Sequence, residues 1–253
     1  MIHYKSSSEL DKMRRSGRIL ADTIMRVLDA VKPGCSTADL DAVAAARISA
    51  AGAVSNFKGY KGTYPATICT SVNDEIVHGI PSPDRRLGEG DLLSLDFGCI
   101  WEGYHSDSAV SVFVGGVAPT PEAEQLVEVT SSALDAAIAA VRPGARLTDI
   151  GAAIEEVAEP QGLGIVREYG GHGIGRAMHE DPFIQNYGPG GRGPVLKPGL
   201  TVALEPMLNL GGEETRLLAD DWTVVTADGS LSAHFEHTVA VTDDGHEVLT
   251  ARG

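Results

Sequence analysis

The chain has 253 residues, of which 43% are hydrophobic, and it carries a formal net charge of −15 at pH 7. This apolar content suffices for the core of one large domain or of two small ones. The excess of acidic residues excludes nucleic acid and anionic membranes as partners, because both carry the same charge sign as the protein.

The cysteines and the apolar segments indicate the cellular compartment in which the protein is expected. Cys35, Cys69 and Cys99 are odd in number and lack C-x-x-C spacing, so a disulfide framework is not expected. The first residues lack the apolar core of a signal peptide, and no apolar run has membrane-spanning length. We therefore expect a cytoplasmic protein that does not enter a membrane.

The first half of the chain is predicted to form two helices followed by strands. Three serines at 6–8 precede an apolar helical pattern over residues 9–30, which Pro33 and Gly34 end. Ser36 or Thr37 caps a second helix that extends to about residue 51. Alternating apolar residues then predict strands near residues 67–72, 92–99 and 109–114.

The second half repeats this order from Thr120 and Pro121. Helices are predicted near residues 122–141 and 148–159. Strands are predicted near residues 164–167, 201–208, 222–226, 235–242 and 247–250. Helices and strands that are grouped in this way predict an α+β fold, with a curved and mostly antiparallel sheet covered by helices on one side.

Three blocks of sequence occur once in each half, in the same order. The matched pairs are residues 31–34 with 141–144, 87–96 with 196–205, and 105–112 with 234–241. The period is too long for a solenoid, so the pattern indicates duplication inside one domain. We expect a single domain over residues 1–253, with internal halves of about 1–118 and 119–253 related by pseudo-two-fold symmetry.

The repeat suggests which acids meet at one site. Each half supplies two acids from two strands, and the matched acids are Asp96 with Glu205 and Asp107 with Glu236. Alternation places these acids beside small residues such as Ser94. The alternative is that they are solvated residues of an outer face, which is the common place for acids on strands.

A metal centre follows if the four acids converge with His172. Together they would bring about four negative charges into one buried site, which a fold tolerates only when cations neutralise them. Two divalent ions would balance this charge. Oxygen-rich ligands with a single histidine suit Mn, Fe or Co better than a thiolate-rich zinc site would.

Other motifs near the histidines exclude several kinds of chemistry. The glycine-rich segment 170–175 lacks the dinucleotide-binding register, and its glycines instead allow close approach to His172. His179-Glu180 lacks the second histidine of the zinc-protease helix. His78 lies on a turn rich in glycine and proline, where a lone histidine is more often structural than catalytic. No G-x-S-x-G motif occurs, so covalent catalysis is disfavoured.

The chain resembles a type I methionine aminopeptidase in motifs spread over nearly its whole length: Lys58-Gly59-Tyr60, Asn73-Asp74-Glu75 with His78-Gly79-Ile80-Pro81, Gly171-His172-Gly173-Ile174-Gly175, His179-Glu180-x-Pro182, Leu204-Glu205-Pro206-Met207 and Phe235-Glu236-His237-Thr238. The resemblance implies the duplicated pita-bread fold. It also implies removal of the initiator methionine from nascent chains, with preference for a small second residue.

The resemblance further implies the role of each residue in the metal centre. Asp96 would bind one metal ion, and His172 and Glu205 mainly the other. Asp107 and Glu236 would bridge two divalent ions, with Co, Mn, Fe or Zn as candidates. Glu205 would also carry a proton from water to the leaving amine.

Two further histidines and a side-chain pocket follow from the same resemblance. His179 would stabilise the developing oxyanion, and His78 would contact the peptide nitrogen beyond the scissile bond. The methionine side chain would bind among Tyr60, Tyr64, Cys69 and Trp222, with Phe57 and Met178 beside them. Met178 and Phe57 depart from the residues usual in the family, which puts the fine shape of the pocket in doubt.

Two alternatives remain open at this point. Asp96-Phe97-Gly98 and Tyr104–Asp107 also resemble the X-Pro aminopeptidase and prolidase branch, whose members usually carry a large N-terminal domain. The second alternative is a non-catalytic binding protein with the same fold. The expected partners are the N-termini of nascent polypeptides, and the chain is expected to be a monomer. Ribosome docking is left open, because the sequence shows no basic patch for it.

Overall fold

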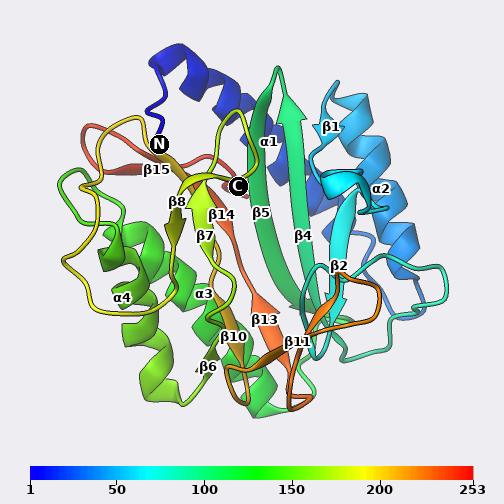
Figure 1. Cartoon of the computed structure of the whole chain (residues 1–253). Coiled ribbons are helices and arrows are strands. Elements are labelled where there is room, and N and C mark those ends of the chain that lie inside the picture. Colours follow the sequence, from blue (N-terminus) through cyan, green and yellow to red (C-terminus); the bar gives the residue numbers. More distant parts are fainter. Residues whose placement is uncertain (253) are drawn as a thin grey trace.

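The computed structural model describes residues 1–252 (Figure 1). The first half contains two α-helices, a short 3₁₀ helix and five strands: α1 (Ser7–Leu28), α2 (Thr37–Ala50), β1 (Val54–Ser55), η1 (Tyr60–Gly62), β2 (Ile68–Val72), β3 (Glu75–Val77), β4 (Leu92–Trp101) and β5 (Tyr104–Phe113). The helices confirm the predicted elements to within about two residues.

The second half again begins with two helices. Its elements are α3 (Pro121–Ala140), α4 (Thr148–Ala158), η2 (Glu159–Gln161), β6 (Gly164–Ile165), β7 (Gly171–Gly173), β8 (Glu180–Ile184), β9 (Thr201–Leu204), β10 (Met207–Asn209), β11 (Thr215–Leu217), β12 (Val224–Thr226), β13 (Ser232–His234), β14 (His237–Val241) and β15 (His246–Val248). Among residues 1–252, no helix has both the length and the apolar character needed to cross a bilayer.

The helices begin where local hydrogen bonds satisfy their free N–H groups. At α1 the backbone N–H of Ser6 donates to the Glu9 carboxylate at 2.9 Å. At α2 the backbone N–H of Asp39 donates to Ser36 Oγ at 3.2 Å, so Ser36 is the cap. At α3 Thr120 caps the helix and Pro121 occupies its first turn. Each cap contributes about 1 kcal/mol to the stability of its helix.

Two of the predicted strands have the wrong extent: one is divided in two, and the other starts later than predicted. The strand expected over residues 201–208 divides at Glu205-Pro206 into β9 and β10, since a proline has no N–H to donate within a sheet. The strand expected over residues 235–242 is preceded by β13 and starts only at His237 as β14. The backbone of Glu236 pairs instead with Ala109 of β5, at N–O distances of 3.0 and 3.2 Å.

All strand pairs described are antiparallel, as predicted. In one sheet β4 pairs with β1, β2 and β5, and in another the order is β15-β14-β9-β7-β8. The bonds between Glu236 and Ala109 join these two sheets at their centre. Two smaller sheets, β13-β10-β6 and β11-β12-β3, extend the lower part of the molecule in Figure 1.

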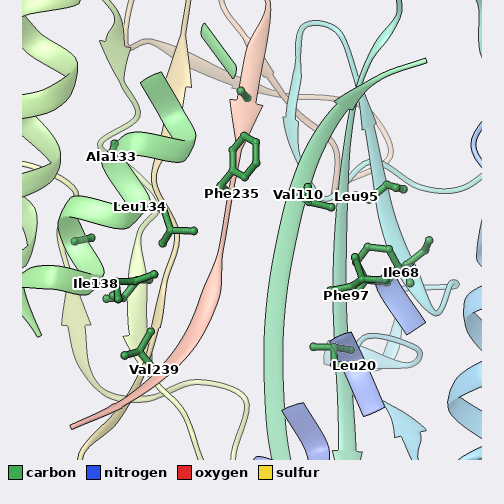
Figure 2. Packing of buried hydrophobic residues seen from close by; sticks show 14 of the residues in the cluster. Leu20, Ile68, Leu95, Phe97, Val110, Ala133, Leu134, Ile138, Phe235 and Val239 are labelled. Atoms are coloured by element: carbon green, nitrogen blue, oxygen red, sulfur yellow. The ribbon is translucent and has the colours of Figure 1, made fainter. Parts of the chain in front are cut away.

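The main hydrophobic core lies between the sheets and the four α-helices (Figure 2). Leu95 and Phe97 of β4 are fully buried there, together with Leu20 of α1. Leu134 of α3 and Val239 of β14 occupy the corresponding place in the second half. Burial of each such side chain contributes roughly 1.5–3 kcal/mol. Because side chains alternate along a strand, the residue between Leu95 and Phe97 must point to the opposite face, away from the helices.

Candidate metal centre

The first two acids come from neighbouring strands. Asp96 of β4 lies opposite Ala109 of β5, and Asp107 of β5 lies opposite Gly98 of β4. The two carboxylates are therefore diagonal neighbours on the face that points away from the helices, within reach of a shared ligand. Thr238 of β14 fixes this part of β5, because its hydroxyl accepts from the backbone N–H of Asp107 at 2.9 Å and donates to the Asp107 carbonyl at 2.8 Å.

The other two acids lie where two paired strands end. His237 of β14 pairs with Leu204 of β9, so Glu236 and Glu205 stand opposite each other just beyond the paired residues. His172 of β7 pairs with Ala203 of β9 and enters the same face. Since Glu236 also pairs with β5, the topology brings all five predicted ligands together from both halves of the chain.

The distances fit shared coordination. Asp107, His172 and Glu236 are buried, and each offers one ligand atom within 4.8 Å of the other two. His172 Nε2 lies 3.5 Å from a Glu205 carboxylate oxygen. His172 Nδ1 lies 2.9 Å from the carbonyl oxygen of Gly173, which can only accept, so Nδ1 carries the proton and Nε2 presents its lone pair to the site.

Burial and mutual repulsion disfavour the charged forms of the four acids. Burial raises the pKa of Asp96 to about 7, and it raises the pKa of Glu205 and Glu236 well above the usual range. For Asp107, burial raises the pKa and the nearby charges of Asp96 and Glu205 raise it further. One carboxylate oxygen each of Asp96, Asp107 and Glu236 is buried with no hydrogen-bond partner within residues 1–252.

These unpartnered oxygens and the imidazole lone pair form a donor set for divalent metal ions. Burial lowers the pKa of His172 to about 3, so the imidazole is neutral and its nitrogen is free to bind a metal. Four acidic groups that repel one another become stable as anions when divalent cations lie between them. The residues present therefore fit the metal ions that the sequence predicts.

A cavity of about 310 Å³ opens over the five ligands. Every residue that the sequence assigned to the site lines it: the five ligands, His78, His179, Phe57, Tyr60, Tyr64, Cys69, Met178 and Trp222. The cavity thus joins a charged floor to an aromatic wall. The structure thus brings all of these residues to one cavity, and their individual roles stay predictions.

The wall of the cavity is a small apolar cluster. Phe57, Tyr64 and Cys69 are buried, and Tyr60 and Trp222 are half-buried against them. The rings of Tyr64 and Trp222 meet edge to face with centroids 5.1 Å apart. The Tyr64 hydroxyl donates to the carbonyl of Ile68 at 3.0 Å, which holds that ring in place. The result is a rigid slot for an unbranched apolar side chain.

Two histidines flank the ligands at the open side. His179 is exposed, its Nδ1 lies 2.9 Å from the Tyr60 hydroxyl, and its ring centroid lies 4.2 Å from that of His172. Desolvation lowers the pKa of His179, and it lowers the pKa of His78 to about 4. His78 has a φ of 63°, a left-handed conformation that costs about 1–3 kcal/mol in a residue with a side chain. Both rings are neutral at pH 7 and can exchange hydrogen bonds with a peptide.

Sequence reasoning missed two residues that line the cavity, Lys61 and Tyr169. Tyr169 meets the His78 ring edge to face with centroids 5.9 Å apart. The sequence did contain a signal for Tyr169. It is an aromatic residue directly before Gly170 and Gly171, and so lies close to the predicted ligand His172. Lys61 follows Tyr60, and nothing in its local pattern distinguishes it from an ordinary exposed lysine.

Comparison with known proteins places the chain among metal-dependent peptidases. The model of metallopeptidase family M24 matches residues 11–243. A methionine aminopeptidase of Clostridium acetobutylicum is 47% identical over 250 residues, which cover 99% of this chain and 99% of that protein. Methionine aminopeptidase 1 of Mycobacterium tuberculosis is 48% identical over 256 residues, with 99% of this chain and 95% of that protein covered.

Solved structures of related proteins have the same fold. The crystal structure of a methionine aminopeptidase from Rickettsia prowazekii superposes with a TM-score of 0.96 at 41% identity, covering 99% of this chain and 100% of that one. A prolidase from Pyrococcus horikoshii shares the fold with a TM-score of 0.76 at 18% identity, but only 64% of its length is covered. The predicted pita-bread fold is therefore confirmed, and the chain belongs to metallopeptidase family M24 and, within it, to the methionine aminopeptidases.

Proposed function

We propose that this chain hydrolyses the first peptide bond of polypeptides that begin with methionine and releases that methionine. The observation that carries the proposal is the junction of the cation-binding acids with a closed apolar slot of aromatic residues. The slot suits a methionine side chain, and the metal centre beside it suits the free α-amine of an N-terminus. A substrate bound in this way presents its first peptide bond to the metal centre.

The ligands divide into three groups in this proposal. Asp96 would hold one cation, His172 and Glu205 would hold mainly the other, and Asp107 and Glu236 would be shared between them. Bound divalent cations would supply positive charge to polarise the scissile carbonyl and to increase the acidity of water. The protein fixes these ligands on strands of two joined sheets, so the site is rigid before a substrate arrives.

Three residues of the cavity act on the substrate. Glu205 accepts a proton from the attacking water and delivers it to the leaving amine. His179 donates a hydrogen bond to the carbonyl oxygen as negative charge develops there. His78 hydrogen-bonds the peptide nitrogen beyond the scissile bond. The lowered pKa values of both histidines support these roles, because neutral rings do not repel the cations.

The substrate range and the setting follow from the same proposal. A small second residue is favoured, because the peptide must pass between the rings that surround the metal centre. The substrates are nascent polypeptides, and the chain acts as a monomer in the cytoplasm. Three buried free thiols support a reducing compartment.

A comparison of two peptides tests the proposal. The metal-loaded protein should cleave Met-Ala-Ser and leave Ala-Pro-Ala intact, with products measured by chromatography. Faster cleavage of Ala-Pro-Ala would instead support the X-Pro aminopeptidase activity, and cleavage of neither peptide with metal bound would support a binding protein.

The role of His179 has a separate test. His179→Ala should lower kcat about 100- to 1,000-fold, because one hydrogen-bond donor to the developing oxyanion is lost. Metal content, measured by atomic emission, should be unchanged because this residue is not a ligand. Loss of metal from the variant would show that His179 is needed for metal binding, which contradicts its assignment as a hydrogen-bond donor only.

A further inference from the structure

His179 lies in a turn whose first residues are bonded to neighbouring strands: the Ile174 N–H donates to the Thr201 carbonyl at 3.1 Å, and the Gly175 carbonyl accepts from the His105 N–H at 2.8 Å. The turn joins β7 to β8, and the register between these strands is irregular: His172 pairs with Phe183, whereas the next residue, Gly173, pairs with Glu180. One step along β7 thus corresponds to three along β8. Residues 176–179, which carry His179, lie outside both strands, so contacts other than strand pairing hold this part of the turn.

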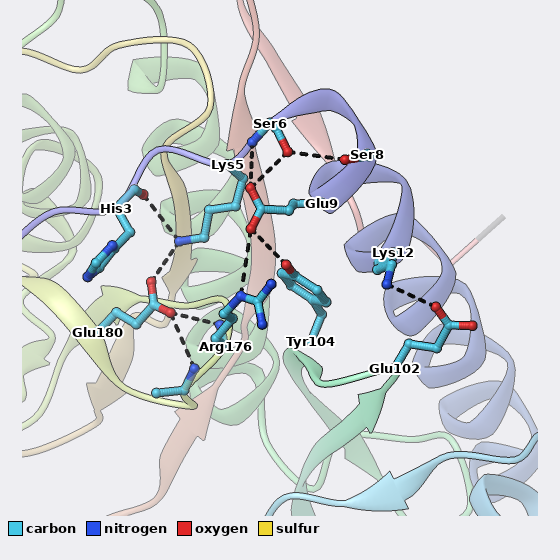
Figure 3. Close-up of polar contacts among 11 residues, drawn as sticks. His3, Lys5, Ser6, Ser8, Glu9, Lys12, Glu102, Tyr104, Arg176 and Glu180 are labelled. Atoms are coloured by element: carbon cyan, nitrogen blue, oxygen red, sulfur yellow. Dashed lines mark hydrogen bonds and ion pairs between the residues drawn. The ribbon is translucent and has the colours of Figure 1, made fainter.

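An ion pair from the N-terminal segment reaches this turn (Figure 3). Lys5 Nζ donates to a Glu180 carboxylate oxygen at 2.7 Å, with the two side chains only 4% and 10% exposed. The other oxygen of Glu180 accepts from the backbone N–H of Arg176 at 2.8 Å. The residue that follows His179 therefore links the start of its turn to the N-terminal segment.

The N-terminal segment is itself anchored on both sides of this pair. The backbone N–H of Lys5 donates to the Gly199 carbonyl at 2.7 Å. Glu9 of α1 accepts from the Tyr104 hydroxyl at 2.7 Å and lies 3.7 Å from the Arg176 guanidinium (Figure 3). A Cβ added to Gly175 would lie 2.4 Å from the Lys5 side chain, so the turn and Lys5 are in tight contact.

The His179 ring has its neighbours in the cavity: the His172 ring, with centroids 4.2 Å apart, and the Tyr60 ring, with centroids 5.7 Å apart. It is exposed, and the Tyr60 hydroxyl is its hydrogen-bond partner. The position of its backbone therefore decides where the ring lies. A buried ion pair adds little net stability, but it disfavours arrangements that would separate the two charges.

We propose that Lys5 and Glu180 are positioning residues, which hold the 174–180 turn in the position that places His179 over the metal centre. The inference rests on the proposed role of His179 and extends it to residues that do not contact the substrate. The N-terminal segment thereby becomes part of the catalytic apparatus, although it lies outside the cavity.

The test is a double-mutant cycle on the metal-loaded full chain, with Met-Ala-Ser as substrate. Glu180→Gln removes the charge that Lys5 requires and should lower kcat about 10- to 100-fold, because small misplacements of a catalytic group cost that much. KM and metal content should change less than about twofold. In a His179→Ala background, the same substitution should have no further effect on kcat, because it acts through His179.

Controls separate this role from a structural one. Glu247→Gln breaks the Arg14–Glu247 pair, which also ties α1 to the body of the protein but lies outside the cavity lining, and kcat should stay unchanged. Lys5→Met should reproduce Glu180→Gln, and Lys5→Arg should restore most of kcat. If Glu180→Gln does not fold, the Lys5 variants carry the same test.

Two outcomes would overturn the inference. One is wild-type kcat in both Glu180→Gln and Lys5→Met, and the other is an equal loss of kcat with and without the His179 imidazole. A failure of the proposed function would appear differently, since the unmodified protein would not cleave Met-Ala-Ser at all.

Discussion

The Asp107 carboxylate has a position that few acids in proteins share. It is buried, one of its oxygens has no hydrogen-bond partner within residues 1–252, and its backbone is bonded to Thr238 of the opposite half. An acid held in this way suits a metal ligand, because burial without a cation destabilises its charge.

Asp107→Ala should therefore lose both metal and activity. The side chain that contacts both cations in our proposal is gone, and the remaining ligands bind metal more weakly. Metal content after gel filtration and hydrolysis of a Met-Ala-Ser peptide measure the two losses. Asp135→Ala, which removes an exposed acid of α3, is the matched control and should retain both. A fully active Asp107→Ala variant with its metal would refute the shared-ligand role.

The candidate site was predictable at the level of residues to an unusual extent. The four acids recur beside small residues in both halves, and the glycine-rich segment and the resemblance added His172, so the sequence predicted five residues that the structure brings to one cavity. Lys61 escaped because lining a cavity is a tertiary property and no neighbour in the sequence indicates it, whereas Tyr169 had a local signal in its place before the glycines that precede His172. The contact of Lys5 with Glu180 likewise spans 175 residues.

Helices and strands were less predictable than the site residues, chiefly at points where the backbone changes its strand-pairing partner. Periodicity located the helices, because an apolar stripe and a capping residue are local signals. It joined β9 to β10 wrongly, since apolar residues continue past Glu205 although Pro206 ends the pairing. It also missed the glycine-rich strand β7, which forms because neighbouring strands pair with it and not because its residues favour strands.

The close packing of β7 gives a prediction at this scale. A Cβ on Gly171 would lie 2.5 Å from the carbonyl oxygen of Ala203 on β9. Gly171→Ala should therefore push apart the strands that place His172, lower the free energy of unfolding by about 2–3 kcal/mol and weaken metal binding. Urea unfolding of the metal-free protein measures the first effect.

Gly212→Ala is the matched control for that substitution. A Cβ there would approach nothing closer than 3.9 Å, so the free energy of unfolding should change by less than about 0.5 kcal/mol. Equal stability of Gly171→Ala and the unmodified protein would show that the β7–β9 contact can relax.

At the scale of the whole molecule, the metal centre determines how stability depends on pH. Without cations, the raised pKa values of Asp96 and its neighbours mean that the folded protein keeps protons that the unfolded chain releases. The four carboxylates therefore contribute stability to the metal-free protein that is lost as pH rises from about 4, the ordinary carboxyl pKa, through about 7, the pKa of Asp96. Buried histidines such as His78 and His172, whose pKa values are lowered to about 4 and about 3, give the opposite slope below about pH 6.5, so comparison with Asp96→Asn is needed to isolate the carboxylate contribution.

Bound cations should reverse this trend, because they favour the ionised carboxylates in the folded state. Melting temperatures at pH 5.5 and pH 8, with and without Mn²⁺, provide the measurement. Metal-free Asp96→Asn should lose less stability between these two values than the unmodified protein does. A metal-free protein that becomes more stable from pH 5.5 to pH 8, to the same extent in both variants, would contradict the electrostatic account.

The class of the fold followed from the order of helices and strands, and the superposition on methionine aminopeptidases confirms it. The division into halves of about 1–118 and 119–253 stays a prediction. What the order of elements could not give is the bond between Ala109 and Glu236, which joins the two sheets and closes the metal centre. That contact depends on how the two sheets dock, and no local pattern encodes it.

The most direct measurement is release of methionine from Met-Ala-Ser by one protein sample before chelation, after removal of divalent ions, and after addition of Mn²⁺, Fe²⁺ or Co²⁺. Activity should disappear on chelation and return with at least one of these ions. Unchanged hydrolysis by a sample shown to contain no divalent metal would contradict the account, because the buried acids would then have another purpose.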